Sequence, residues 1–543
     1  MTGCQRSYLD VDIPEQVVDF STVLSRVEFA LEHLNKNDKF SSPSFQYLPA
    51  DVFDAASCAK HQIQALMDLE ELNSEDEDAL DDGFFVCDLK VVFQKLVAWR
   101  QLFPRIKPFF ALKCNPDPMV AAILGATTSI AKDEATSEVT TAAGFDCASI
   151  PEIELALLQK HRQGSLDNCI TKRSNVVYAN PQRAEKDLEI ALTTYKIRLL
   201  TFDGPEEIYK IHRTYQQHLA KEMNGNEKNK NNELPQLVLR ILVPDEHSSV
   251  PLGEKFGVPP DNIPSLVELA VQLKLPIVGV SFHCGSGNHD PNSYAQAIVL
   301  AHTALQVIDE IQNPDGVPPC WLLDIGGGYP GCDGIGASRG RFCGVAQQQP
   351  LNKEEESKDI DAEIETASKI ASVVSPLIDR LFPQSESSLL GPGHPSRHAI
   401  DIISEPGRYF VEEAFSLCSR IYRIEIEYEN GSSQSGNAIW RHYYIAQGVQ
   451  GVFKDVLLCG EKFTPIPLRM MGGHGQKEGT NELIPSAVHG PSGEEYDIIC
   501  PNHPLPELHV GDWLVFDRMG AYTLSIAARS GRPTIRYVVG GTN

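Results

Sequence analysis

Short apolar runs alternate with amphipathic segments through the middle of the chain. Eight runs of aliphatic, aromatic and β-branched residues are each followed by a polar or glycine-bearing turn and then by a helical segment. They span 109–112, 145–148, 176–179, 199–202, 237–241, 277–282, 322–325 and 400–404. Strands that alternate with helices in this way predict an α/β fold with a closed (β/α)₈, TIM-like barrel rather than an open doubly wound sheet.

The pattern changes after residue 408, where strands follow one another without helices between them. This predicts a C-terminal antiparallel β-sandwich or β-barrel domain at 409–543. Its expected strands are 416–428, 441–445, 509–516 and 534–539. We expect the residues before the barrel to supply strands that this domain lacks.

The N-terminal segment, 1–83, has mixed patterning and carries an acidic stretch, 68–82, that we expect to be a solvated loop. A strand at 84–89 and a helix at 90–103 then open the predicted barrel domain, 84–408. Polar stretches rich in Gly, Ser, Asn and Gln are expected to be surface insertions. They span 125–143, 221–234, 331–358 and 384–398.

The composition limits the classes of partner that the protein is expected to bind. The chain has 543 residues, 42% hydrophobic and 22% charged, and a net charge of −26 that argues against nucleic acid or an anionic membrane as the main partner. Its 13 cysteines include no CxxC pair, no signal peptide is evident, and no apolar run approaches the roughly 20 residues that span a bilayer. We therefore expect a cytoplasmic protein with reduced thiols and no metal site.

Lys113 is the candidate reactive group. It follows the first barrel strand in 108–115, PFFALKCN, directly before a polar turn. An amine at the end of a buried strand is poorly solvated, so it is easier to deprotonate and can form a Schiff base. A lone lysine of this kind more often reaches toward water, so the remaining strand ends decide between the two interpretations.

The loops after the seventh and eighth strands are rich in glycine, as expected of a phosphate site in this type of barrel. Residues 324–330 read DIGGGYP, and 405–408 read EPGR, which adds a guanidinium. The sixth strand leads into His283 and Ser286. A lone triple glycine is more often a simple turn. The prediction of a phosphate site therefore depends on both loops following the last two barrel strands.

Together these strand ends fit pyridoxal phosphate. Lys113 would bond to the cofactor's aldehyde, His283 would stack on the ring, and Glu405 would face the pyridine nitrogen. The phosphate would be held by Ser286 and the glycines Gly326, Gly327 and Gly328. A carboxylate at the ring nitrogen keeps it protonated and makes the ring a strong electron sink, which favours decarboxylation over racemisation.

The chain also resembles the eukaryotic ornithine decarboxylases, within the family of barrel-type, pyridoxal-phosphate-dependent decarboxylases of basic amino acids. The matching stretches run from Phe84 to Val539. They are PFFALKCN at 108, GFDCAS at 144, VVYANP at 176, LLTFDG at 199, VGVSFHCGSG at 278, LLDIGGGYPG at 322, EPGRYF at 405 and LPELHVGDWLVFDRMGAYT at 505. The family fold is a barrel plus a β domain built from both chain ends, which agrees with the pattern above.

The resemblance implies further roles. Cofactor contacts are expected for Lys113, Asp146, Glu152, Arg240, His283, Ser286, Gly328, Glu405, Gly407, Arg408 and Tyr522. Family members are head-to-tail homodimers with shared active sites, and Lys255 and Asp497 match a pair that bridges the subunits. The resemblance therefore predicts a homodimer that acts on a small basic amino acid.

The substrate side departs from the family. Where the family has GP-[ST]-C-D, with a proton-donating cysteine and a substrate-binding aspartate, residues 490–494 read GPSGE. Gly493 has no proton to give, and Glu494 is one methylene longer than aspartate. Cys459 stands at the position of a second substrate-binding aspartate, and Asp455 lies nearby. Loss of a positioned general acid costs about 10²–10⁴ in rate, so these changes bear on function.

Three interpretations follow. The favoured one is an active decarboxylase of ornithine or a related basic amino acid, which uses Lys113 and His283, with the proton supplied by Glu494, Cys459, Cys500 or water. The second is a catalytically impaired paralogue that binds a decarboxylase or its regulatory partner. The third is a decarboxylase of a different amino acid, since the carboxylates on the substrate side, Glu494 included, differ in length and placement.

Overall fold

The protein is described by a computed structural model. The described residues are 28, 44–47, 83–125, 128–129, 139–140, 143–157, 175–223, 234–252, 255–313, 320–331, 366–383, 400–429, 437–469, 482–527 and 532–539. The predicted acidic loop and most of the four predicted insertions lie outside these residues.

Eight parallel strands close into a barrel in the order β11-β13-β14-β3-β6-β7-β8-β9. The strands are β3 (Ile106–Ala111), β6 (Gly144–Cys147), β7 (Val176–Tyr178), β8 (Leu199–Phe202), β9 (Gln236–Arg240), β11 (Ile277–Ser281), β13 (Leu322–Asp324) and β14 (Asp401–Ser404). Each lies at one of the eight predicted positions, so the predicted barrel is confirmed. Apolar side chains from most of the strands fill its interior, among them Phe109, Val177, Val238, Val278 and Ile403.

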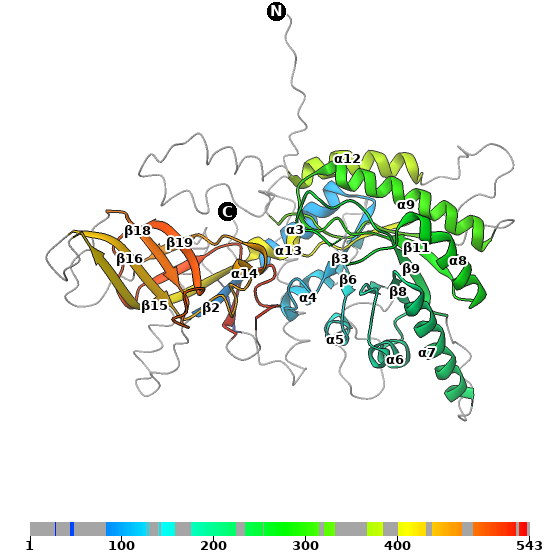
Figure 1. Cartoon of the computed structure of the whole chain (residues 1–543), viewed down its shortest axis with the longest axis horizontal. Helices are drawn as coiled ribbons and strands as arrows, with labels where there is room; N and C mark the ends of the chain where they lie inside the picture. Colours follow the sequence, from blue (N-terminus) through cyan, green and yellow to red (C-terminus); the bar gives the residue numbers. More distant parts are fainter. Residues whose placement is uncertain are drawn as a thin grey trace, which may run out of the picture.

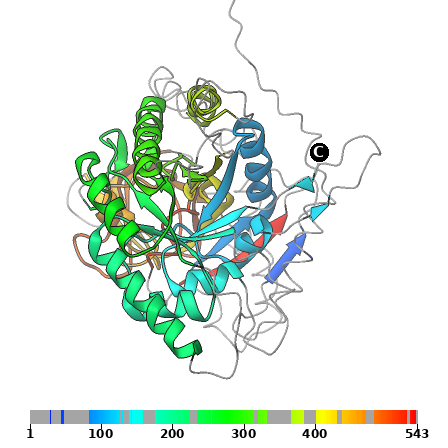
Figure 2. The same ribbon diagram turned by 90° about the vertical axis from the view of Figure 1, so that its right-hand side faces the viewer.

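Helices surround the barrel, as the end-on view in Figure 2 shows. They are α3 (Leu89–Leu102), α4 (Pro118–Gly125), α5 (Ile150–Leu157), α6 (Glu185–Thr193), α7 (Pro205–Met223), α8 (Ile263–Gln272), α9 (Pro291–Gln312), α12 (Thr366–Leu381) and the short α13 (Arg408–Val411). Local sequence fixes where they begin. The Asp88 carboxylate accepts the Lys90 amide (3.0 Å) at the start of α3, and Asp290 caps α9 in the same way with Pro291 in its first turn.

The second domain is a nine-stranded sheet at the opposite end of the molecule from α8 and α9 (Figure 1). Its strands are β1 (Ser44–Tyr47), β2 (Gly83–Asp88), β15 (Phe415–Tyr428), β16 (Ala438–Ile445), β17 (Pro465–Leu468), β18 (Ile484–His489), β19 (Ile498–Leu505), β20 (Trp513–Phe516) and β21 (Thr534–Val539). A short helix, α14 (Asp455–Cys459), follows β16. Small two-stranded pairs and 3₁₀ turns complete the described structure: β4 (Thr128–Ser129) with β5 (Val139–Thr140), β10 (Ser248–Val250) with β12 (Ser286–Asn288), η4 (Pro260–Asn262) and η5 (Glu412–Ala414).

The sheet corrects three details of the prediction. It is mixed, because β21 pairs in parallel with β1 and β2, and β16 pairs in parallel with β18. The strand predicted at 509–516 begins only at Trp513, because the Asp512 carboxylate accepts the His509 amide (2.8 Å) in a turn. β2, which was expected to open the barrel, pairs with β15 and β21 of the sheet, so the barrel segment begins with α3.

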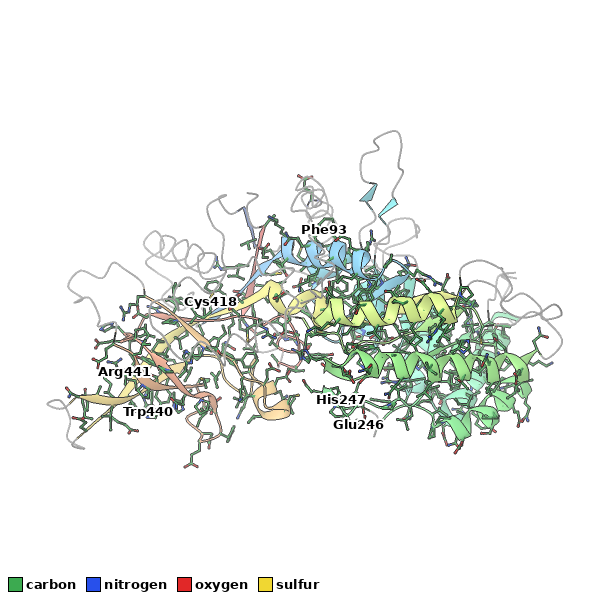
Figure 3. The ribbon with its side chains drawn as sticks, turned by 90° about the horizontal axis from the view of Figure 1, so that it is seen from above. Phe93, Glu246, His247, Cys418, Trp440 and Arg441 are labelled. Carbon is green, nitrogen blue, oxygen red and sulfur yellow. The ribbon has the colours of Figure 1, made fainter. Side chains whose placement is uncertain are left out.

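The sheet domain contacts the barrel where the first barrel strand ends. The Tyr522 amide donates to the Cys114 carbonyl (3.0 Å), and the Asn115 side chain donates to the Gly520 carbonyl (2.8 Å). In Figure 3, Cys418 on β15 lies toward the barrel, whereas Trp440 and Arg441 lie farther out on the sheet. The chain after β20 is thus brought to the mouth of the barrel.

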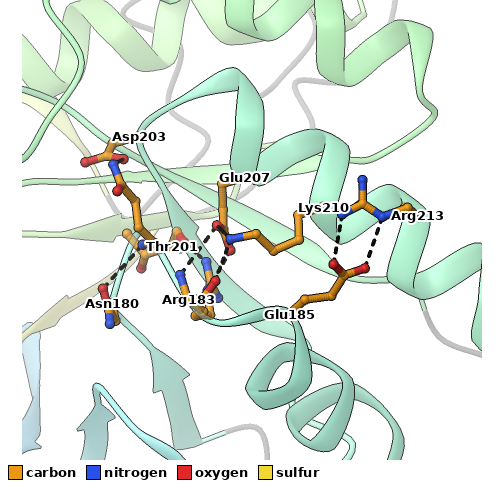
Figure 4. A network of polar contacts seen from close by, with 9 residues as sticks. Asn180, Arg183, Glu185, Thr201, Asp203, Glu207, Lys210 and Arg213 are labelled. Atoms are coloured by element: carbon orange, nitrogen blue, oxygen red, sulfur yellow. Dashed lines mark hydrogen bonds and ion pairs between the residues drawn. The ribbon is translucent and has the colours of Figure 1, made fainter.

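A buried ion network stiffens the barrel rim after β7 and β8 (Figure 4). Glu207 accepts from Arg183 Nε (2.9 Å) and from Lys210 Nζ (2.6 Å). Next to it, Asp203 accepts the side chain of Gln182 (3.3 Å) and the amide of Gly257 (3.2 Å). Among the described residues, no helix combines the length and the hydropathy that crossing a bilayer requires.

Candidate active site

A pocket lies at the C-terminal ends of the barrel strands, where the strand ends that carry the predicted chemistry meet. The empty space in the pocket and at its open mouth is about 260 Å³. It is lined by Ala111, Lys113, His283, Ser286, Gly328, Tyr329, Glu405, Gly407, Arg408 and Tyr522. Eight of these ten residues were predicted to contact the cofactor, and they come from the ends of β3, β11, β13 and β14 and from the segment after β20.

Lys113 extends from the end of β3 to a buried carboxylate. Its Nζ lies 2.5 Å from Asp146 Oδ2, at the end of the neighbouring strand β6. Burial lowers the pKa of the Lys113 ammonium, but Asp146, Glu405 and Tyr522 raise it more strongly, so the net shift is upward. The prediction of an amine that is easier to deprotonate is therefore wrong for this structure, because these neighbours hold the amine as an ammonium.

The loop after β13 leaves no room for side chains. A Cβ on Gly327 would lie 2.5 Å from the Glu405 carbonyl and 2.8 Å from His283 Nε2. Gly328 has φ +106°, and a Cβ there would lie 2.2 Å from the Gly285 carbonyl. Gly326 is equally restricted, with a Cβ position 1.9 Å from the Phe282 carbonyl. The bare backbone can therefore approach a phosphate closely.

His283 is held in one orientation by the turn that follows β11. Its Nδ1 accepts the Gly285 amide (2.9 Å), so the neutral ring carries its proton on Nε2. Burial, and then the charges of Lys113 and Arg240, lower its pKa well below the usual range. A neutral, fixed imidazole suits stacking on an aromatic ring, the role predicted for it.

Arg408 and Tyr522 close the pocket from the side of the sheet domain. Arg408 Nη1 lies 3.3 Å from Glu412, and its guanidinium lies over the Tyr522 ring, 5.5 Å from the centroid. Burial lowers the pKa of Arg408, but the charge of Glu412 raises it more strongly, so the guanidinium stays charged. Gly407 packs against Cys114, where a Cβ would come within 2.8 Å of the Cys114 Cβ. The pocket thus has a fixed cation next to its glycine loop.

Two predicted cofactor residues lie beside the pocket. Glu152, in the first turn of α5, accepts from the Ala148 amide (2.7 Å) and the Ser149 hydroxyl (2.9 Å). Arg240, at the end of β9, stacks on Phe256 at 4.7 Å. Burial lowers the pKa of Arg240, whereas Glu405 and other nearby carboxylates raise it. Neither residue is among those that line the pocket.

The predicted substrate residues lie elsewhere. Glu494 is exposed in the turn after β18. The neighbouring Gly493 has φ +73°, and no atom lies within 4 Å of the place that a Cβ would take there. Cys459 is exposed at the end of α14, with its Sγ 4.0 Å from Asp455 Oδ1. Within one subunit, neither Glu494 nor Cys459 lines the pocket.

The two residues predicted at a subunit interface differ in environment. Lys255 is exposed. Asp497 is buried, and its carboxylate accepts the amides of Val449 (2.8 Å) and Ser492 (3.0 Å). Asp497 therefore fixes the turn that carries Gly493, a role that the sequence did not indicate.

Sequence reasoning assigned no role to Tyr329 and Asp324. Tyr329 lines the pocket, and Asp324 is fully buried at the end of β13 with Oδ1 accepting the Gly326 amide (2.9 Å). The signal was present for Asp324, because a carboxylate at the end of a buried barrel strand points to a functional site.

The residues present fit pyridoxal phosphate. The glycine loop and Arg408 suit its phosphate, the Lys113 amine suits its aldehyde, and the buried Glu405 carboxyl suits its ring nitrogen. Asp146 Oδ1 is buried with no donor among the described residues, which is a further vacant acceptor beside the amine. The pocket thus supplies each kind of group that this cofactor requires.

Comparisons with known proteins agree with a pocket for pyridoxal phosphate. Residues 89–412 match the family model described as pyridoxal-dependent decarboxylase, pyridoxal binding domain. Antizyme inhibitor 2 of Xenopus laevis is 31% identical, over 82% of this chain and 78% of that protein. Ornithine decarboxylase of Mus pahari is 28% identical, over 87% of this chain and 83% of that protein.

Solved structures share the fold. The arginine decarboxylase of Paramecium bursaria Chlorella virus has a TM-score of 0.63 at 23% identity, covering 88% of this chain and 100% of that one. The lysine/ornithine decarboxylase of Vibrio vulnificus, complexed with cadaverine, has a TM-score of 0.60 at 21% identity, covering 90% and 100%. The barrel, the pocket and the family match together show that this chain belongs to the pyridoxal-dependent decarboxylases and is ornithine-decarboxylase-like, with pyridoxal phosphate as its cofactor.

Proposed function

We propose that this protein decarboxylates a basic amino acid, with L-ornithine, and hence putrescine for polyamine biosynthesis, as the first candidate. The observation that carries the proposal is the convergence of Lys113, His283, Glu405 and Arg408 on one pocket. When bound, the cofactor supplies an electron sink for the carbanion that loss of carbon dioxide leaves.

The protein's own residues would then have separate tasks. Lys113 would hold the cofactor through its amine, and Asp146, 2.5 Å away, would hold that amine as an ammonium when it is free. His283, which is kept neutral, covers one face of the ring without adding charge. Arg408 and the glycine loop would hold the phosphate and so orient the cofactor in the pocket.

Recognition of the amino acid's distal cation is assigned to carboxylates on the sheet domain. Glu494 is exposed and available to a second subunit, and Asp455 is buried at the start of α14. Burial raises the pKa of the Asp455 carboxyl, and the charge of Arg408, which lines the pocket, opposes this shift. Cys459 lies on the same face of α14, one turn after Asp455.

A homodimer with shared sites is part of the proposal. Lys255 is exposed, as a residue that pairs across an interface would be in a single subunit, and Glu494 is exposed in its turn at the end of β18. We propose a cytoplasmic location, which suits the free thiols of the eight cysteines in the described residues. Light scattering of wild type and Lys255→Ala tests whether the protein is a dimer. If wild type is a monomer, Glu494 cannot reach the active site of a second subunit and has no role there.

A second function is favoured by Gly493. A residue without a side chain at the family's proton-donor position fits a catalytically impaired paralogue that binds other proteins, and a relative with the name antizyme inhibitor 2 is 31% identical. Against it stands the retained pocket, because a chain freed from catalysis has no need for Lys113, Glu405 and Arg408 together.

One experiment separates these functions. Carbon dioxide release is measured with ornithine, lysine, arginine and diaminopimelate for wild type, Gly493→Cys and the matched control Gly493→Ser. Release from ornithine by wild type supports the first candidate, and release only from another amino acid supports a different substrate. If wild type is silent with all four and only the cysteine variant is active, the impaired paralogue is the correct function.

A further inference from the structure

Three charged side chains lie in a row where the sheet domain meets the barrel. Arg408 begins α13, Glu412 follows in η5, and Arg518 lies in the loop after β20. The Glu412 carboxylate lies between the two cations. Its Oε2 is 3.3 Å from Arg408 Nη1, and its Oε1 accepts from Arg518 Nη2 (2.6 Å) and Nε (2.9 Å). The row therefore joins a side chain that lines the pocket to a side chain of the sheet domain.

The backbone holds Arg518 against η5. The Gly520 amide donates to the Glu412 carbonyl (3.2 Å), and the Met519 amide donates to the Phe415 carbonyl (2.9 Å). Arg518 itself has φ +55°, in the left-handed region that residues with a side chain rarely adopt. An unfavourable backbone conformation that the surrounding hydrogen bonds maintain suggests that the side chain placed by it has a function.

Glu412 is a buried carboxylate beside the predicted phosphate site. Its side chain is 3% exposed, whereas the side chain of Arg518 is 45% exposed. Glu412 also fills the space that a Cβ on Gly331 would take, at the end of the loop after β13. A negative charge at this place repels a phosphate and neutralises Arg408, the cation that the phosphate requires. Glu412 alone would therefore weaken phosphate binding.

The second cation corrects this balance. Burial raises the pKa of Glu412, but Arg408 and then Arg518 lower it more strongly, so the carboxyl group is ionised. Two guanidinium groups and one carboxylate leave a net charge of +1. The shorter hydrogen bonds of Glu412 go to Arg518, and the longer contact goes to Arg408. The carboxylate is thus compensated mainly from the side away from the pocket.

We propose that Arg518 is a positioning residue for the cofactor's phosphate, because it compensates the buried Glu412 carboxylate and leaves the positive charge of Arg408 available to the phosphate. Arg518 is not among the residues that line the pocket, so it acts through Glu412. The inference rests on the proposed role of Arg408 at the phosphate and does not depend on the substrate.

The test compares affinities for pyridoxal phosphate by fluorescence titration of the cofactor-free protein. In Arg518→Met, Glu412 cancels the charge of Arg408, and the affinity should fall about 10-fold. In Glu412→Gln, neither cation is opposed, and the affinity should rise by a similar factor. The double variant again has one net positive charge and should bind as wild type does. A double variant as weak as Arg518→Met, or equal binding by wild type and Arg518→Met, would overturn the proposal.

Three controls separate charge from shape. Arg518→Lys keeps the charge and should bind nearly as wild type does. Arg213→Met removes an arginine of similar exposure, 52%, from a pair with Glu185 (3.0 Å) between α6 and α7, and should not alter the affinity. Pyridoxal, which lacks the phosphate, should bind equally to all these variants. If pyridoxal follows the same order of affinities, Arg518 shapes the pocket instead, and the proposal is wrong.

The outcome can be read even if Arg518→Met does not fold, because Glu412→Gln alone then decides. Tighter binding of pyridoxal phosphate supports the proposal, and equal or weaker binding contradicts it. No substrate is present in these titrations, so a protein that releases no carbon dioxide is tested equally well. If Arg408→Met binds pyridoxal phosphate as tightly as wild type, Arg408 does not hold the phosphate and the inference is overturned.

Discussion

The cofactor side and the substrate side of this protein are built in opposite ways. Around the glycine loop, each position is restricted by its neighbours, and a single added carbon at Gly327 would meet two other segments within 2.8 Å. Around Gly493, nothing lies within 4 Å of the position of an added Cβ. The departures from the family motif thus lie where the fold tolerates change, and the matching residues lie where it does not.

The largest effect is expected on the cofactor side, from Lys113→Ala. Without the amine no covalent bond to the cofactor can form, so the visible absorbance of the bound cofactor should be lost and any carbon dioxide release should fall by more than about 10³-fold. Lys107→Ala, on the same strand but bonded to Asn175 (2.8 Å), should keep the spectrum. A borohydride-reducible adduct in Lys113→Ala would show that another residue is the nucleophile.

The contrast between the two regions can be tested with one substitution in each. Gly327→Ala should weaken pyridoxal phosphate binding by about 5–150-fold, because overpacking costs about 1–3 kcal/mol where the cofactor must approach. Gly493→Ala should leave cofactor affinity unchanged and lower the free energy of unfolding by about 1 kcal/mol, because of its φ of +73°. Fluorescence titration and urea unfolding measure these effects, and equal losses of cofactor affinity would remove the contrast.

The smallest effect concerns pH. Burial raises the pKa of Asp324 to about 7, so between about pH 4 and pH 7 the folded, cofactor-free protein binds more protons than the unfolded chain. This contribution to stability is present below about pH 4 and is lost as the pH rises through 7. Asp324→Asn should remove it and flatten the decline by about 1–2 kcal/mol.

Urea unfolding of wild type and Asp324→Asn, in two buffers about two pH units apart that bracket neutral pH, measures this difference. Asp309→Asn is the matched control, because Asp309 is also buried but lies on α9, where it accepts the Cys320 amide (3.1 Å). Asp117, whose pKa burial raises to about 6, contributes equally to all three proteins and cancels in the comparison. A decline in Asp324→Asn as steep as in wild type would show that Asp324 is ionised throughout this range.

The barrel could be predicted from sequence because its strands are short, apolar and regularly followed by helices. The sheet was harder to predict. β17, β18 and β19 contain prolines at 465, 467, 485, 501 and 504, which interrupt a strand pattern. The parallel pairing of β2 with β21 joins distant parts of the chain, and no local pattern encodes it.

The candidate site shows the same division. Lys113, His283, Glu405 and the glycines follow strands whose ends meet by the geometry of a barrel, so their convergence could be predicted. The role of Asp497 in holding the turn at Gly493 depends on amides of Val449 and Ser492, which approach it only in the folded sheet. The closeness of Asp324 and Glu405 likewise depends on the pairing of β13 with β14, two strands that are far apart in sequence.

The pairing of β2 with β21 also has a consequence for how the chain is made. Phe84 pairs with Thr534 and Asp88 with Val538, so β2 cannot gain this neighbour until β21 has left the ribosome. The barrel strands, in contrast, all lie before Glu405 and can associate earlier. During synthesis, the edge of β2 that later pairs with β21 therefore stays unpaired. Truncation of β21 should destabilise β2, near the start of the sheet domain in sequence, as much as the strands near the C-terminus.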